Sequence, residues 1–263
     1  MNNLAYPSLR ALYIEAHRNG VPPAPATGFV IETKKGPHLI TNRHVVTGAH
    51  NIARTVSWIP TELKIQHHKK GHLGQWVSRV EQLVVENVNQ WHEHPVLGDE
   101  ADFVALPLTQ LDEVDLYSVD PVNPWYAEVD GDKGMDFLLS PSDMVSIVGF
   151  PFGKSSSGYV PIWVTGFLAS ELSENFEGLP VQLIDSRTRP GQSGSPVFAY
   201  RSGGPVPTEK GVATIFSGPV AKLLGVYSGR INEQSDLGRV WKVSVLADLV
   251  HAINMKNGNA AGD

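Results

Sequence analysis

The chain has 263 residues, of which 41% are hydrophobic, so it is long enough to bury one large core or two small ones. Its formal net charge of -6 creates no positive field for phosphate backbones or anionic lipid, which argues against nucleic acid and membrane partners. Cysteine is absent, which excludes disulfides, thiolate metal sites and a cysteine nucleophile.

Targeting and membrane segments are not evident. Residues 1–20 lack the basic start and the uninterrupted apolar stretch of a signal peptide. No later run approaches the roughly 20 consecutive apolar residues that a membrane span needs. We therefore expect a soluble, cytoplasmic protein.

The first predicted element is an amino-terminal helix over Pro7–His17. Its apolar stripe at helical spacing consists of Leu9, Leu12, Tyr13 and Ala16. Asn19 and Gly20 end the pattern. On this interpretation residues 1–25 form a helical extension.

The middle of the chain consists of short apolar runs separated by turn residues. Most of the 25 Gly and 19 Pro lie between these runs, as hairpin and loop connections require. The β-branched, aromatic or alternating character of the runs predicts an all-β fold. The runs are TGFVIET, PHLITNRHVV, EQLVVENV, DFVALPL, MVSIVGF, PIWVTGFLA, LPVQLID, GSPVFAY, KLLGVYSG and RVWKVSV.

A second helix is predicted over Val245–Met255, with Ser244 as its N-cap. Its apolar face, which we expect to pack on the β structure, consists of Leu246, Leu249, Val250 and Ile253. Residues 257–263 are expected to form a disordered tail. The acidic stretch Leu111–Pro141, with its Pro and Gly turns, is the candidate connection between two β units.

A serine stands in the glycine-rich run PGQSGSPVF, residues 190–198. Glycine on both sides lets the backbone bend sharply and approach a substrate carbonyl closely. Such a turn can present Ser193 as a nucleophile and direct the N–H groups of Gly191 and Ser193 at a developing oxyanion. For this motif alone, an ordinary Gly-Ser hairpin turn is the alternative explanation.

A histidine and an aspartate precede this serine in fitting contexts. LITNRHVVTG places His44 between a strand and a turn of small residues, and EADFVALPL places Asp102 at the head of an apolar strand. Taken singly, such a histidine is more often an ordinary surface or core residue, and such an acid a solvated turn residue. Their order and their spacing to Ser193 leave room for several strands between them.

Together these motifs resemble those of the trypsin and chymotrypsin clan, in particular its disulfide-free bacterial glutamyl endopeptidases and HtrA-type proteases. TGFVIETKKGPHLITNRHVV is similar to the amino-terminal barrel, and HEHP with ADFVALPL to the segment around the aspartate. IVGFPFG resembles the opening of the second barrel, and VQLIDSRTRPGQSGSPVF the nucleophile region. The resemblance covers roughly residues 26–250. It implies two six-stranded antiparallel β-barrels of the chymotrypsin type, over residues 26–125 and 126–256.

The resemblance implies a serine endopeptidase that forms an acyl-enzyme intermediate. Ser193 is then the nucleophile, His44 the general base and Asp102 the acid that orients it. The N–H groups of Gly191 and Ser193 form the oxyanion hole. No metal or organic cofactor is implied. The expected partner is a protein or peptide substrate, and a regulatory or inhibitory protein is a candidate restraint on proteolysis inside a cell.

The resemblance also locates the substrate-binding wall, at Arg187, Thr188, Arg189, Pro190, Val226, Tyr227, Ser228 and Gly229. The aspartate with which trypsin attracts basic side chains falls at Arg187, so a preference for Arg or Lys is not expected. Tyr227 stands where glutamyl endopeptidases have a histidine, which does not favour a strict glutamate preference. If directed inward, Arg187, Arg189 or Arg230 would pair with an acidic side chain, whereas outward ones leave a pocket for small or apolar residues. The Val226–Gly229 strand is expected to pair with extended substrate.

Several alternatives remain at this stage. A catalytically silent peptide-binding module on the same fold is one, although such proteins normally lose a triad or oxyanion residue. An α/β-hydrolase esterase needs its acid and histidine after the serine, whereas here His44 comes first. Asp99 is the nearest other candidate for the catalytic acid. A metal site at the histidines is not expected, because they lie in loops without cysteine; they are His67, His68, His72, His92 and His94.

Gln192 bears on activation. In trypsin-like zymogens an aspartate at this position pairs with a freshly cut amino terminus. An uncharged amide cannot form that ion pair, so no activation cleavage of this kind is expected.

Overall fold

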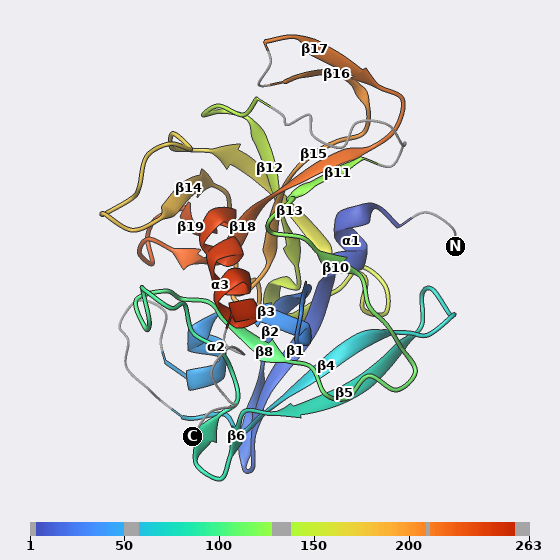
Figure 1. The fold of residues 1–263 in the computed structure, drawn as a ribbon, viewed down its shortest axis with the longest axis vertical. Helices are drawn as coiled ribbons and strands as arrows, with labels where there is room; N and C mark the ends of the chain where they lie inside the picture. Colours follow the sequence, from blue (N-terminus) through green and yellow to red (C-terminus); the bar gives the residue numbers. More distant parts are fainter. Residues whose placement is uncertain (1–3, 50–57, 128–137, 209–210, 256–263) are drawn as a thin grey trace.

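The computed structural model describes residues 4–49, 58–127, 138–208 and 211–255, and most of its elements are β-strands (Figure 1). The first sheet has the strand order β5-β4-β1-β2-β3-β8, in which every neighbouring pair is antiparallel. Its strands are β1 (Ala11–Arg18), β2 (Val21–Thr33), β3 (Gly36–Thr41), β4 (Glu62–Lys69), β5 (Trp76–Gln82) and β8 (Val104–Pro107). Two short strands extend it: β9 (Val114–Asp115) pairs with β4, and β10 (Ser118–Val119) pairs with β2.

The second sheet closes into a six-stranded antiparallel barrel. Its order is β18-β15-β12-β13-β14-β19, and β19 pairs back with β18. The strands are β12 (Met144–Gly149), β13 (Ile162–Leu168), β14 (Val181–Asp185), β15 (Pro196–Arg201), β18 (Val220–Arg230) and β19 (Leu237–Lys242). β11 (Trp125–Ala127) adds to β18. The predicted all-β, chymotrypsin-like fold is confirmed, and its division after residue 125 stays a prediction.

Three cores hold these sheets together, and β2 contributes to two of them. Because side chains alternate along a strand, Phe29 and Ile31 face the core that joins the two sheets, whereas Ala26 and Val30 face the core of the first sheet. β15 also contributes to two cores: Phe198 belongs to the joining core, and its neighbours in the strand belong to the core of the second barrel. The joining core therefore fixes the two sheets against each other.

The amino-terminal prediction is wrong beyond Arg10. A short helix, α1 (Tyr6–Arg10), is followed directly by strand β1, which pairs with β2 and β4. In β1 the buried side chains recur at every second residue, at Leu12, Ile14 and Ala16. This period-two pattern belongs to a strand, and pairing on both edges outweighs the helical spacing of the same apolar residues. Residues 11–25 thus belong to the first sheet and not to a helical extension of residues 1–25.

The carboxyl-terminal helix is confirmed as α3 (Val243–Met255). It begins two residues before the predicted start, so Ser244 lies in its first turn and does not precede it. The predicted apolar face is buried in the joining core, together with Val245. The predicted tail, residues 257–263, lies outside the described residues, as does the middle of the Leu111–Pro141 connection.

The remaining elements are small. Two hairpins leave the sheets, of which the second projects beyond the barrel at the top of Figure 1; they are β6 (Val84–Val85) with β7 (Val88–Asn89), and β16 (Gly204–Pro207) with β17 (Ala213–Phe216). The one-turn helix α2 (Arg43–Thr47) follows β3, and the 3-10 turn η1 (Pro151–Gly153) follows β12. Within the described ranges, no helix combines the length and the apolar character needed to cross a membrane.

Candidate active site

His44 lies in α2, directly after β3, and Asp102 lies just before β8. Because β3 and β8 are paired neighbours, the ends of these strands bring the two residues together. Asp102 accepts two hydrogen bonds from His44, one from the backbone N–H to Oδ1 at 3.0 Å and one from Nδ1 to Oδ2 at 2.8 Å. A carboxylate only accepts, so Nδ1 carries a proton and Nε2 is left as the acceptor of the neutral ring.

The backbone of Asp102 is also fixed by a hydrogen bond. Asn42 is completely buried, and its Nδ2 donates to the Asp102 carbonyl oxygen at 2.7 Å. Asp102 itself is only 9% exposed. The sequence LITNRHVV therefore supplies both the imidazole and an amide that fixes its acidic partner.

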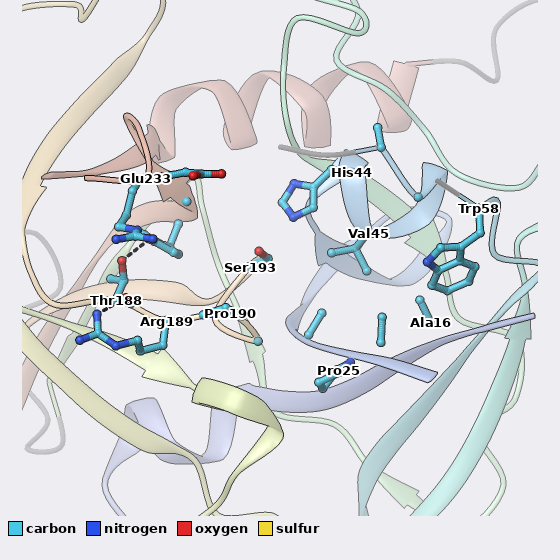
Figure 2. Close-up of a pocket in the computed structure, with 18 residues that line it drawn as sticks. Ala16, Pro25, His44, Val45, Trp58, Thr188, Arg189, Pro190, Ser193 and Glu233 are labelled. Carbon is cyan, nitrogen blue, oxygen red and sulfur yellow. Dashed lines mark hydrogen bonds between the residues drawn. The ribbon is translucent and has the colours of Figure 1, made fainter. Parts of the chain in front are cut away.

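Ser193 lies in the turn between β14 and β15, and two glycines with positive φ shape this turn. Gly191 has φ +93° and Gly194 φ +83°. A Cβ atom on Gly191 would lie 2.4 Å from the Phe150 carbonyl oxygen, and one on Gly194 would lie 2.2 Å from the Thr27 carbonyl oxygen. Only glycine fits these positions, and the resulting turn directs the Ser193 side chain into the cleft toward His44 (Figure 2).

Thr27 of β2 anchors this turn to the first sheet. Its N–H donates to the Ser193 carbonyl oxygen at 2.9 Å, and its hydroxyl donates to the Gly191 carbonyl oxygen at 2.9 Å. The same hydroxyl accepts the N–H of Phe150 at 3.2 Å. Thr27 is fully buried, so these groups have no water to replace it. Sequence reasoning did not single out Thr27, whose local signal was only its place before Gly28 in TGFVIET.

The N–H groups predicted to form an oxyanion hole lie next to η1, which contacts the residue before Gly191. The Phe152 N–H donates to the Pro190 carbonyl oxygen at 2.6 Å. In a trans peptide the carbonyl and the following N–H point in opposite directions, so the Gly191 N–H is turned away from η1. Across the described part of the chain, the N–H groups of Gly191 and Ser193 have no protein acceptor, which leaves both available to a ligand oxygen.

An open cleft of about 710 Å³ lies in front of Ser193 and His44 (Figure 2). From the amino-terminal half it is lined by Ala16, Ala24, Pro25, Ala26, His44, Val45, Gly48, Ala49 and Trp58. From the carboxyl-terminal half it is lined by Thr188, Arg189, Pro190, Gly191, Ser193, Tyr227, Gly229, Arg230 and Glu233. Arg230, one of the three arginines considered for the pocket, does line the cleft. Trp58 and Glu233 were not predicted, since nothing in their local sequence signals that they reach it.

Five of the eight residues predicted to bind substrate line this cleft, namely Thr188, Arg189, Pro190, Tyr227 and Gly229. The other three lie elsewhere. Arg187 is exposed outside the cleft, and Val226 is buried in the joining core. Ser228 is buried and lines a small cavity together with Asp102.

The structure also gives the positions of Asp99, the other candidate for the catalytic acid, and of Gln192. Asp99 is exposed and lines a separate cavity beside Arg43 and Trp91, whereas Asp102 contacts His44. Gln192 is fully buried inside the turn, where its Oε1 accepts the Arg189 N–H at 2.8 Å. The Gln192 amide is thus a structural part of the turn that carries Ser193.

The other histidines have local roles. His94 Nδ1 accepts the N–H groups of Val96 and Leu97, as expected for the turn at His94-Pro95. Burial lowers the pKa of His67 to about 4, so this ring is neutral at physiological pH. Over the described residues, no three His, Asp or Glu side chains gather as a metal-binding cluster.

The Thr27 hydroxyl provides a first prediction. Thr27→Val should lower the free energy of unfolding by about 1–3 kcal/mol, because the Gly191 carbonyl and the Phe150 N–H both lose a buried partner. Urea unfolding measures this change. Thr27→Ser keeps the hydroxyl and is the matched control, expected to lose less. Equal loss in the two variants would contradict the role given to the hydroxyl.

The chain matches the model of a known protein family. The model of the trypsin-like peptidase domain matches residues 26–206, which is more than half of the chain. No curated protein matches the chain in sequence.

Three solved structures illustrate the similarity of the fold. The Rv3671c protease from M. tuberculosis, active form, is 15% identical with a TM-score of 0.50, over 93% of this chain and 81% of that chain. The serine endoprotease from Yersinia pestis is 12% identical with a TM-score of 0.50, over 98% and 69%. The thermostable serine protease AL20 from an extremophilic microorganism is 10% identical with a TM-score of 0.51, over 96% and 100%. At these identities the likeness concerns the fold.

Proposed function

Because the chain belongs to the trypsin-like peptidase family, we propose that it is a serine endopeptidase with His44, Asp102 and Ser193 as its catalytic triad. The observation that carries the proposal is the paired hydrogen bonding of His44 to the Asp102 carboxylate, in a cleft that also holds Ser193. Family membership alone does not assign these roles, since function resides in the site.

In the first half of the reaction, His44 Nε2 takes the hydroxyl proton of Ser193 as Oγ attacks the carbonyl carbon of the scissile bond. The resulting oxyanion accepts hydrogen bonds from the N–H groups of Gly191 and Ser193. Each such donor is worth roughly 10²–10³ in kcat. His44 then gives its proton to the leaving amine, the C–N bond breaks, and Ser193 carries the acyl group.

In the second half, water replaces the amine. His44 takes a proton from the water as its oxygen attacks the acyl carbon, and it returns the proton to Ser193 Oγ as the acid is released. Throughout, Asp102 stabilises the imidazolium form of His44 and keeps its Nδ1 oriented. Proton transfer and charge stabilisation are thus both supplied by side chains and backbone groups of this chain.

A peptide-binding module that does not cut is the competing function. The two functions are separated by incubating the purified chain with a denatured protein mixture and identifying new amino termini by mass spectrometry. We expect new termini whose formation is blocked by a serine-directed phosphonate. Peptide binding without any new termini would favour the module and contradict the proposal.

Activation by trimming is not expected. Gln192 is neutral and already bonded inside the turn, so it offers no charge to a new amino terminus. A cut near Gly28 would also sever β2 in mid-strand, between its pairings with β1 and β3. Intact-mass measurement alongside the rate should show that the untrimmed chain is active. A chain that becomes active only after such a cut would refute this prediction.

A further inference from the structure

We propose that Tyr227 determines specificity, by closing the floor of the pocket that takes the side chain before the scissile bond and limiting it to a short, uncharged residue such as Ala, Ser, Thr or Val. The inference rests on the proposed function, because it concerns the substrate of the same site. It names the substrate class that the proposed function leaves open.

The position of this pocket follows from the site. A substrate carbonyl that sits against Ser193 Oγ, with its oxygen on the Gly191 N–H, places the adjoining side chain beside the nucleophile turn. The strand that carries Tyr227 forms the opposite wall, since the Gly194 N–H donates to the Tyr227 carbonyl at 3.0 Å and the Tyr227 N–H donates to Ser195 at 2.9 Å. Thr188 and Tyr227 both line the cleft between these walls.

The hydroxyl groups of Thr188 and Tyr227 are hydrogen-bonded to each other across this space. Thr188 is 1% exposed and Tyr227 2% exposed, so hardly any of either side chain is accessible, although both line the cleft. The bond joins the two walls of the pocket from one side to the other. A side chain that enters between the walls therefore meets this pair and can go no deeper.

The Tyr227 ring has no room to swing aside. It belongs to the core of the second barrel and packs closely against Gly238, where a Cβ atom would lie 2.7 Å from Tyr227 Cε2. Among the residues that the structure describes, Tyr227 is also the largest fully buried side chain. Because protein interiors are close-packed, displacing this ring would disturb the barrel itself. The floor is a rigid feature of the fold.

The Tyr227 phenol at the floor is also uncharged. Burial raises the pKa of Tyr227 to about 12, so its phenol stays protonated at physiological pH. Arg187 stands where trypsin has the aspartate that attracts basic substrate side chains, and it is exposed outside the cleft. Three charged residues line the cleft near this pocket. Arg189 and Glu233 are exposed, and Arg230 is half-buried. A basic substrate side chain would lose hydration at the floor without gaining an acidic partner. An acidic one would gain only Arg230, whose charge already acts on the Tyr227 phenol.

The test uses fluorogenic peptides that differ only in the residue before the cut: Ala, Ser, Val, Leu, Phe, Lys and Glu. For the unmodified chain we expect kcat/KM for Ala, Ser and Val to exceed that for the other four by about tenfold or more. Tyr227→Val removes the floor and should raise the Leu-to-Ala and Phe-to-Ala ratios by about tenfold. Tyr227→Phe is the matched control, which keeps the ring and should keep the preference for short side chains.

Several results would overturn the inference. One is cleavage after Leu, Phe, Lys or Glu as efficient as cleavage after Ala in the unmodified chain. Another is a Tyr227→Val variant that is folded by circular dichroism yet keeps the original ratios. If that variant does not fold, the unmodified chain and Tyr227→Phe decide the question by themselves. Absence of Ser193-dependent cleavage for every peptide would instead overturn the proposed function, and this inference with it.

Discussion

Ser193→Ala should lower kcat for peptide hydrolysis by about 10⁴-fold or more, because the acyl-enzyme intermediate needs the Ser193 oxygen. The fold should not change. Among the described residues the Ser193 hydroxyl has no hydrogen-bond partner in the protein, so its removal leaves no buried group unsatisfied. The measurements are the rate of peptide hydrolysis and the covalent labelling of the chain by a serine-directed phosphonate, followed by intact mass.

Ser195→Ala is the matched control for this experiment. Ser195 lies two residues further along the same turn, is fully buried and packs against Gly149. Its hydroxyl also lacks a hydrogen-bond partner over the described residues, so its loss should leave labelling and most of the activity in place. Retained activity in Ser193→Ala would contradict the assignment of Ser193 as the nucleophile. Equal loss in both variants would point to collapse of the turn.

Asp102→Asn should lower kcat by roughly 10⁴-fold near neutral pH while leaving the geometry intact. With its oxygen still accepting the His44 backbone N–H, the new amide would present its NH₂ group to His44 Nδ1. An NH₂ group donates, so the ring proton would move to Nε2, and Nε2 could no longer accept the proton of Ser193. Steady-state kinetics on an efficiently cleaved peptide measure this loss.

Asp99→Asn is the matched control for the acid. Asp99 is three residues earlier, exposed, and lines a different cavity, so its substitution should leave kcat nearly unchanged. A loss under tenfold for Asp102→Asn would show that another group orients His44. A large loss for Asp99→Asn with a small one for Asp102→Asn would exchange the two roles.

The local sequence was sufficient to predict features that depend on a few neighbouring residues. The alternating and β-branched runs predicted the strands, and the helical spacing of Leu246, Leu249, Val250 and Ile253 predicted the buried face of α3. The residue types around Ser193 indicated a turn, because two positions there tolerate only glycine. The motifs around His44, Asp102 and Ser193 pointed to acyl transfer through their resemblance to those of the trypsin and chymotrypsin clan. In each case the information lies within a few consecutive residues, or in the identity of groups with a distinct chemistry.

The tertiary structure decided what depends on partners distant in the chain. Leu12, Ile14 and Ala16 fit a strand only because β2 and β4 pair with both edges of β1. The Thr27 hydroxyl meets the Gly191 carbonyl across 164 positions of the chain, and the Thr188 and Tyr227 hydroxyls meet across 39. The direction of a side chain depends on the register and twist of the strands around it, which the sequence of one segment does not specify. For the same reason only the folded chain shows that Arg187 lies outside the cleft while Tyr227 lines it.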